Sequence, residues 1–303
     1  MPTNQKQFKT YEEQIKLLTD RGMIVTHPEE AKVTLARINY YRLSGYWFPY
    51  FDKKHNRFTP DLTFDKIVAL YNYDSKLRHC LLDALSEVEI TFRALLGYEL
   101  GKHHPLCYRD SNKMGKIAQK DGTHSKQYQD WLVRFQEVKE KSKEEFVIHH
   151  NACYQGEMPI WVAVEIMDWG LLSRLYSLSP SAVQQNIASR CALTQPQVAS
   201  WLKSLNIARN MAAHHSRMYN RAFSILPKLP KNACWEPIRA VTNRVFTIIV
   251  MLIYLHKQFH ISDGLFLHEI IKGFPGDPEK RQKALGVPEN WESIIETITH
   301  EIS

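Results

Sequence analysis

The run from Phe64 to Leu100 constrains the fold of this chain more than any other segment. Apolar side chains recur in it at intervals of three or four residues, which places them on one face of an α-helix. Thr63 stands just before the run and is a residue type suited to cap a helix. We therefore predict one long helix over 64–100, with apolar positions at Ile67, Leu70, Tyr71, Leu77, Leu81, Leu85, Val88, Phe92, Leu95 and Leu96.

Helical spacing also dominates the rest of the chain, and no segment has a convincing strand pattern. Pro28, Pro180 and Thr194 mark helix starts. Polar residues over 52–62 indicate a hairpin or an ordered loop, and the polar stretch over 101–125 indicates a mobile loop that can meet a ligand. The other expected helices cover 11–21, a segment from 27, 127–141, 143–154, a pair from 159 broken at Gly170, a segment from 180, 195–214, 235–259 and 291–298.

We therefore predict an all-α protein that forms one domain over residues 1–303. The domain would carry a loop insertion near 101–125. It would also carry a C-terminal helical extension over 235–303, in which the stretch 273–288 is rich in Gly and Pro.

Composition and charge indicate which class of partner the protein binds and in which cellular compartment it is expected. The chain is 44% hydrophobic and 23% charged, which excludes disorder, and its net charge of +7 favours nucleic acid before membrane as a partner. The five cysteines are far apart and form no C-x-x-C pair, so we expect reduced thiols in a cytoplasmic protein. The first nine residues lack an apolar signal core, and the apolar run over 245–255 is too short to cross a bilayer.

Polar side chains that can handle phosphate crowd the end of the helix expected over 195–214. Arg209, Asn210 and His214 lie there, and His215 and Arg217 follow. Cleaving RNA without a metal needs a base for the 2′-OH proton, an acid for the leaving 5′-oxygen, and a cation for the phosphate. Histidine and arginine suit these tasks. The same residue types also favour any helix C-terminus, because they complement its dipole.

Helix geometry limits how these side chains can cooperate. Asn210 and His214 are four residues apart and share a face, whereas Arg209 and His214 lie about 140° apart around an ideal helix. The last two can converge if Arg209 reaches sideways, if the helix ends near His214, or if a second copy of the chain completes the site. The third option matters because one Arg and one His are few groups for acid–base catalysis.

The segment Arg209–Arg217 resembles the R-N-x-x-A-H-H-x-R motif of Abi-like abortive-infection proteins, the AbiD/AbiF group of the HEPN superfamily. Three further blocks are similar to that family in the expected order: 39–46, 74–93 and 159–176. The resemblance spans roughly residues 10 to 260. Some HEPN toxins carry a regulatory tyrosine two positions after the motif His, and this chain has Ser216 there, so that regulation is not expected.

The resemblance implies a HEPN-like helical bundle with additional N-terminal and C-terminal helices. It implies a metal-independent endoribonuclease toxin of phage defence, with Arg209, Asn210 and His214 as catalytic residues and transphosphorylation by the 2′-OH as the reaction. RNA would be the substrate, a small non-coding RNA could restrain the protein, and a homodimer would complete the site; no DNA or membrane partner is expected. Two alternatives remain open: a non-catalytic module that holds a structured small RNA, and a helical scaffold for protein interactions.

Other residues are candidates for supporting the site or contacting RNA. Glu89 and Arg93 either form a simple i, i+4 ion pair or, as in HEPN proteins, provide an acidic group that orients the motif Arg. Tyr41 and Arg42 belong to the aromatic block over 39–47, which either stacks unpaired bases or packs in the core.

His215 and Arg217 complete the set of expected RNA contacts. The histidine pairs at 103–104 and 149–150 would point about 100° apart on a helix, so we expect no metal and no other cofactor.

Overall fold

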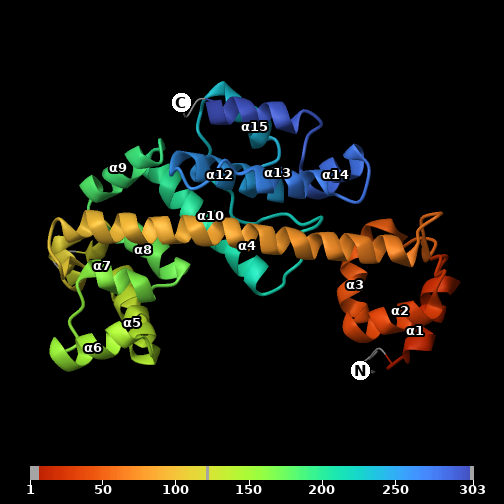
Figure 1. Cartoon of the computed structure of the whole chain (residues 1–303), viewed down its shortest axis with the longest axis horizontal. Helices are drawn as coiled ribbons and strands as arrows, with labels where there is room; N and C mark the ends of the chain where they lie inside the picture. Colours follow the sequence, from red (N-terminus) through yellow and green to blue (C-terminus); the bar gives the residue numbers. More distant parts are fainter. Residues whose placement is uncertain (1–6, 121–122, 301–303) are drawn as a thin grey trace.

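The computed structural model describes residues 7–120 and 123–300, and the fold is all-α as predicted. Helix α4 (Phe64–Gly101) runs along the length of the molecule (Figure 1). Its 38 residues extend about 57 Å at 1.5 Å per residue. The hydroxyl of Thr63 accepts a hydrogen bond from the Lys66 N–H, so the predicted helix and its cap are confirmed. Because its apolar stripe is buried along the whole length, the other helices gather around α4.

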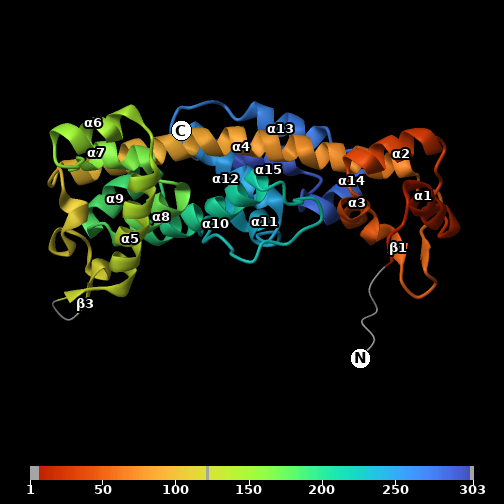
Figure 2. The same cartoon turned by 90° about the horizontal axis from the view of Figure 1, so that it is seen from below.

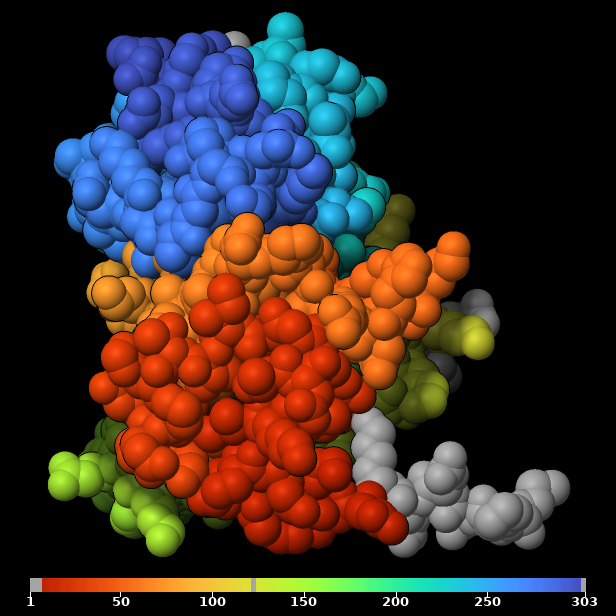
Figure 3. Space-filling view, turned by 90° about the vertical axis from the view of Figure 1, so that its right-hand side faces the viewer, coloured from red at the N-terminus to blue at the C-terminus, as the bar shows by residue number. Residues whose placement is uncertain are grey.

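The N-terminal helices pack at one end of α4. Thr10 caps the first of them through a capping box with Glu13. A short antiparallel hairpin follows, in which Phe51 pairs with Phe58, so the hairpin expected over 52–62 is present. In Figure 3 this lobe lies on one side of α4 and the C-terminal helices lie on the other. The elements are α1 (Tyr11–Asp20), α2 (Pro28–Arg37), α3 (Tyr40–Trp47), η1 (Phe48–Tyr50), β1 (Phe51–Asp52) and β2 (Arg57–Phe58).

A second group of helices packs at the opposite end of α4 (Figure 1). The predicted break at Gly170 is wrong, because the chain breaks at Met167–Asp168 and Gly170 lies inside a helix. Asp168 caps that helix by accepting the Leu171 N–H at 2.8 Å, which is a typical N-cap role for aspartate. The elements are α5 (Lys126–Lys141), α6 (Glu145–Cys153), α7 (Ile160–Ala163), η5 (Val164–Ile166), α8 (Trp169–Leu178) and α9 (Ser181–Arg190).

The segment expected to be a mobile loop over 101–125 packs against this group through several buried side chains, and residues 121–122 lie outside the described residues. Cys107, Tyr108 and Ala118 are buried, and the Gly115 N–H bonds to the Leu178 carbonyl at 2.8 Å. The segment is mostly polar, so the sequence did not indicate that these few apolar residues are buried. The elements are η2 (Cys107–Arg109), η3 (Ser111–Lys113), η4 (Lys116–Ala118), β3 (Gln119–Lys120) and β4 (Thr123–His124).

Helix α10 (Gln195–Ala213) packs against α4 and α8, and the C-terminal helices lie along the middle of α4 (Figure 2). The single helix expected over 235–259 is wrong. It is interrupted over 240–244, where the Asn243 carbonyl accepts the Phe223 N–H at 2.8 Å. The Gly- and Pro-rich tail contains α14, which was not predicted. The elements are η6 (Ala233–Trp235), α11 (Glu236–Arg239), α12 (Val245–Gln258), α13 (Leu265–Lys272), α14 (Pro278–Leu285) and α15 (Trp291–His300).

The most apolar helix, α12, is buried on all sides over Val245–His256 and serves as core. Within residues 7–120 and 123–300, no helix combines the length and the apolar character that spanning a bilayer requires.

Candidate active site

The end of α10 places the motif on the surface. The helix stops at Ala213, His214 is its C-cap, and His215 takes the left-handed conformation with φ of 54°. The His215 N–H bonds to the Ala212 carbonyl at 3.1 Å and the Ser216 N–H to the Met211 carbonyl at 2.8 Å, which is the Schellman arrangement. Of the three ways in which Arg209 and His214 could converge, the helix end near His214 is therefore present.

Exposure is high across the motif. Asn210 and His214 are exposed, and the Arg209 side chain is 37% exposed. The side-chain contacts among these residues are long: Arg209 Nη1 lies 3.5 Å from Asn210 Oδ1, and Asn210 Nδ2 lies 3.4 Å from Asn206 Oδ1. Because hydrogen bonds weaken at such separations, the protein holds these side chains loosely.

Glu89 of α4 lies between two arginines. Its Oε1 is 2.6 Å from Arg93 Nη2, and its Oε2 is 3.9 Å from Arg209 Nε. Arg93 Nη2 also donates to the Met167 carbonyl at 3.0 Å. The carboxylate is only 10% exposed, so both charge contacts are partly shielded from water. The simple i, i+4 ion pair is thus present, and the same carboxylate also makes a longer charge contact with Arg209.

The turn after the motif is fixed by a buried carboxylate. Asp74 of α4 is fully buried, and its Oδ1 accepts the N–H groups of Met218 at 3.1 Å and Tyr219 at 2.7 Å. The Tyr46 hydroxyl donates to Asp74 Oδ2 at 2.6 Å, and the buried Arg78 guanidinium forms an ion pair with the same oxygen. Burial and the neighbouring Asp74 charge raise the pKa of Tyr46 far above its usual range, so this hydroxyl stays a donor. Four donors therefore converge on Asp74, namely two amides of the turn, Tyr46 of α3 and Arg78 of α4.

Helix α3 holds the same turn from outside. The Arg42 guanidinium donates to the His215 carbonyl, and the Arg217 guanidinium donates to the Gly45 carbonyl. These two hydrogen bonds bring Arg42, His215 and Arg217 together, and we call them the clasp between α3 and the turn. Both contacts cross more than 170 residues of chain, so α3 has a direct mechanical link to the residue after His214.

The aromatic rings of the block over 39–47 differ in their exposure. Tyr46 and Trp47 are buried and pack in the core. Tyr41 is 77% exposed on the outer face of α3, where it is accessible to a ligand.

Asp74, Arg78 and Asn206 belong to this site but were not selected from the sequence. A signal for the first two was present, because a charged pair four residues apart falls into the apolar register that contains Leu70, Leu77 and Leu81. Charged residues at core positions of a helix are seldom tolerated unless they are paired.

Metal ligands do not gather in the described part of the chain, where no group of three or more His, Cys, Asp or Glu side chains could share an ion. Cys80, Cys107, Cys153 and Cys191 are free thiols. The rings of His149 and His150 meet edge to face, at 88° and 5.9 Å between centroids.

A comparison with known protein families identifies a match over residues 33–220, to the family described as Abi-like protein. The matched range contains every candidate site residue, from Tyr41 on α3 to Arg217 in the turn after α10. No curated protein and no solved structure matches the chain. Since the match covers more than half of the 303 residues, the chain belongs to the family of Abi-like proteins.

Proposed function

We propose that this Abi-like protein is a metal-independent endoribonuclease of the HEPN type that acts as a toxin in abortive infection, a form of phage defence. Membership of the Abi-like family suggests the role in abortive infection. The observation that supports the chemistry is the end of α10, where Arg209, Asn210 and His214 stand on an accessible surface with the Glu89 carboxylate behind the arginine.

The reaction would proceed by attack of the RNA 2′-oxygen on the adjacent phosphorus. A base removes the 2′-OH proton, the new P–O2′ bond forms, and the P–O5′ bond breaks as an acid protonates the 5′-oxygen. The products are a 2′,3′-cyclic phosphate and a 5′-hydroxyl. His214 would serve as the base or the acid, Arg209 would stabilise charge on the phosphate oxygens, and Asn210 would orient the phosphate.

A homodimer would complete this site. One motif supplies a single His214, whereas the reaction needs two proton-transfer groups, so we place the second group on another copy of the chain. The exposed position of Asn210 and His214 leaves room for such a partner. The net charge of +7 suits an RNA substrate, and DNA is not a substrate because it lacks the attacking 2′-OH.

The test is cleavage of RNA in EDTA by the wild type, Arg209→Ala and His214→Ala, with mapping of the new ends. The wild type should leave cyclic phosphates, and each variant should be about 10²- to 10⁴-fold slower. His79→Ala is a matched control, because His79 is an exposed histidine on α4 remote from the motif in sequence. Undiminished cleavage by both motif variants would remove the motif from the mechanism.

The same samples separate the alternative function. A non-catalytic module would bind RNA in a salt-dependent way, would keep that binding in His214→Ala, and would cleave under no condition. The shared site has its own test: at low protein concentration the initial rate should rise with the square of the concentration. If the protein sediments as a monomer and its rate is strictly proportional to protein concentration, the dimer is contradicted.

A further inference from the structure

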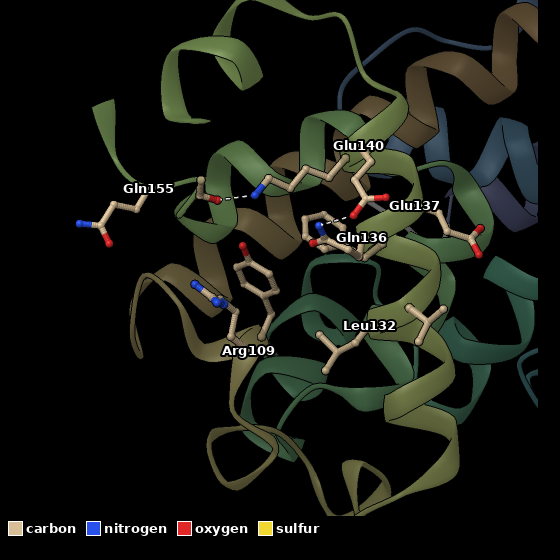
Figure 4. Close-up of a pocket in the computed structure, with 11 residues that line it drawn as sticks. Arg109, Leu132, Gln136, Glu137, Glu140 and Gln155 are labelled. Atoms are coloured by element: carbon tan, nitrogen blue, oxygen red, sulfur yellow. Dashed lines mark hydrogen bonds between the residues drawn. The ribbon is translucent and has the colours of Figure 1, made fainter. Parts of the chain in front are cut away.

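Two cavities flank the turn over 154–157, between α6 and α7. One lies between α5 and η2, with a volume of about 730 Å³, and Figure 4 shows Arg109 and Gln155 at one side of it and Glu137 and Glu140 at the other. The second lies between α6 and α7, with a volume of about 620 Å³. Gln155 lines both cavities, so the turn forms the wall between them. Each volume lies in the range typical of small-molecule sites.

The first cavity contains a lysine that is bound to a backbone carbonyl. Lys139 Nζ donates to the Gly156 carbonyl at 2.5 Å, and in the described ranges no carboxylate oxygen forms an ion pair with it. Arg109 lies nearby and pairs with Glu157 at 2.7 Å. Burial, together with the Arg109 charge, lowers the pKa of Lys139. An anion entering this cavity would relieve the repulsion between the two cations.

The acidic residues of the same cavity already have partners. Glu137 contacts Arg134 at 3.3 Å, and Glu140 accepts a hydrogen bond from Gln136 at 2.9 Å. The Glu140 charge offsets only part of the effect of burial and of Arg109 on Lys139. Neither carboxylate forms an ion pair with Lys139 in the described residues, so the Lys139 ammonium can still bind an anion.

The second cavity is lined by aromatic rings. Tyr154 is 56% exposed and Trp161 is 49% exposed, so part of each ring is open to a ligand. The rings of His149 and His150 lie 5.6 and 5.2 Å from the Tyr154 ring. The Trp161 ring packs closely against the end of α4, because a Cβ atom on Gly101 would come within 2.9 Å of its Cε3. Such a preformed aromatic wall is suited to stacking an unpaired base.

We propose that the two cavities form one nucleotide site, in which Lys139 and Arg109 bind a phosphate and Tyr154 and Trp161 stack the adjacent unpaired base across the turn. The site is distinct from the Arg209–His214 motif, and its ligand is a phosphate-bearing base in single-stranded RNA or in a free mononucleotide. The inference rests on the proposed function only in taking RNA as the natural ligand.

The test is binding of a fluorescent 2′-O-methyl oligonucleotide, which cannot be cleaved, to the full chain over a range of salt concentrations. Lys139→Ala should weaken binding several-fold and reduce the slope of log K against log salt by about 0.7, the value for one phosphate contact on a single strand. Tyr154→Ala should weaken binding about tenfold, because a stacked base contributes about 1–3 kcal/mol, and should leave the slope unchanged. Tyr154→Phe should restore binding.

Lys126→Ala is the matched control, because Lys126 lies on the same helix, pairs with Asp130 and lines neither cavity. Lys139→Gln can still donate to the Gly156 carbonyl, so it distinguishes loss of the positive charge from loss of the fold. AMP is the second probe: competition by AMP that is lost in Lys139→Gln supports the site with a free nucleotide as its ligand. If the Lys139 and Tyr154 variants bind both probes as tightly as the wild type does, the inference is wrong.

The binding and cleavage assays together distinguish failure of the nucleotide site from failure of the ribonuclease function. If binding depends on Lys139 and Tyr154 as expected but the protein cleaves no RNA, only the ribonuclease function is contradicted. Normal cleavage together with unchanged binding by Lys139→Ala and Tyr154→Ala contradicts only the nucleotide site.

Discussion

The two sides of the turn that ends α10 are held in different ways. Before the turn, Arg209, Asn210 and His214 are partly or fully exposed, and their side-chain contacts lie between 3.4 and 3.9 Å. After it, the amides of Met218 and Tyr219 bond to the fully buried Asp74. Groups suited to chemistry are thus separated from the groups that fix the backbone. In the proposed reaction, this division would let the Arg209 and His214 side chains adapt to RNA or to a second chain while the turn stays in place.

The largest expected effect comes from removing the buried anchor. Asp74→Ala should lower the free energy of unfolding by about 3–5 kcal/mol, because it leaves Arg78 as an unpaired buried charge. Urea denaturation measures this value. Asp130→Ala, which breaks an exposed pair with Lys126, should cost at most about 1 kcal/mol. An equally small loss for Asp74→Ala would show that the anchor does not hold the turn.

The external clasp should contribute less than the buried anchor. Arg217→Ala should destabilise the fold by about 1.5–3 kcal/mol, since it removes a charged donor from the Gly45 carbonyl. RNA cleavage by the folded variant should also fall, because the turn beside His214 loses its link to α3. Arg221→Ala serves as the control, since Arg221 is exposed four residues further along. Equal effects of the two substitutions would contradict the clasp.

Glu89→Gln distinguishes an orienting group from a structural ion pair. The substitution keeps the shape but removes the charge between Arg93 and Arg209, so cleavage should slow about tenfold, or about 1.4 kcal/mol in the activation barrier. Initial rates measured on folded protein give the answer, with the exposed Glu87→Gln as control. Reduced stability with an unchanged rate would leave Glu89 as a structural residue only.

The smallest expected effect lies on the exposed side of the turn. His214→Ala and Asn210→Ala should change the free energy of unfolding by no more than about 0.5 kcal/mol, as is usual for exposed positions. Thermal and urea unfolding test this together with the cleavage assay. A loss of 2 kcal/mol or more would mean that the motif is itself part of the structural anchor.

Much of the helical framework could be predicted because its signals are local. The cap at Thr63, the apolar spacing of α4, and the proline and threonine starts of α2, α9 and α10 depend on residues within a few positions of one another. Two of the errors arose where distant contacts decided the backbone. The Asn243 carbonyl is bonded to Phe223, and Gly115 is held by Leu178, and neither contact has a local signature.

The sequence by itself determined the all-α fold and the motif Arg209-Asn210-Met211-Ala212-Ala213-His214, because helix periodicity and residue chemistry are written in short stretches. Only the tertiary structure decided that Asp74 and α3 hold the turn after that motif, and that Glu89 lies behind Arg209. These contacts join residues more than 100 positions apart. Their strength comes from burial and from the convergence of several donors, which depend on how the helices pack around α4.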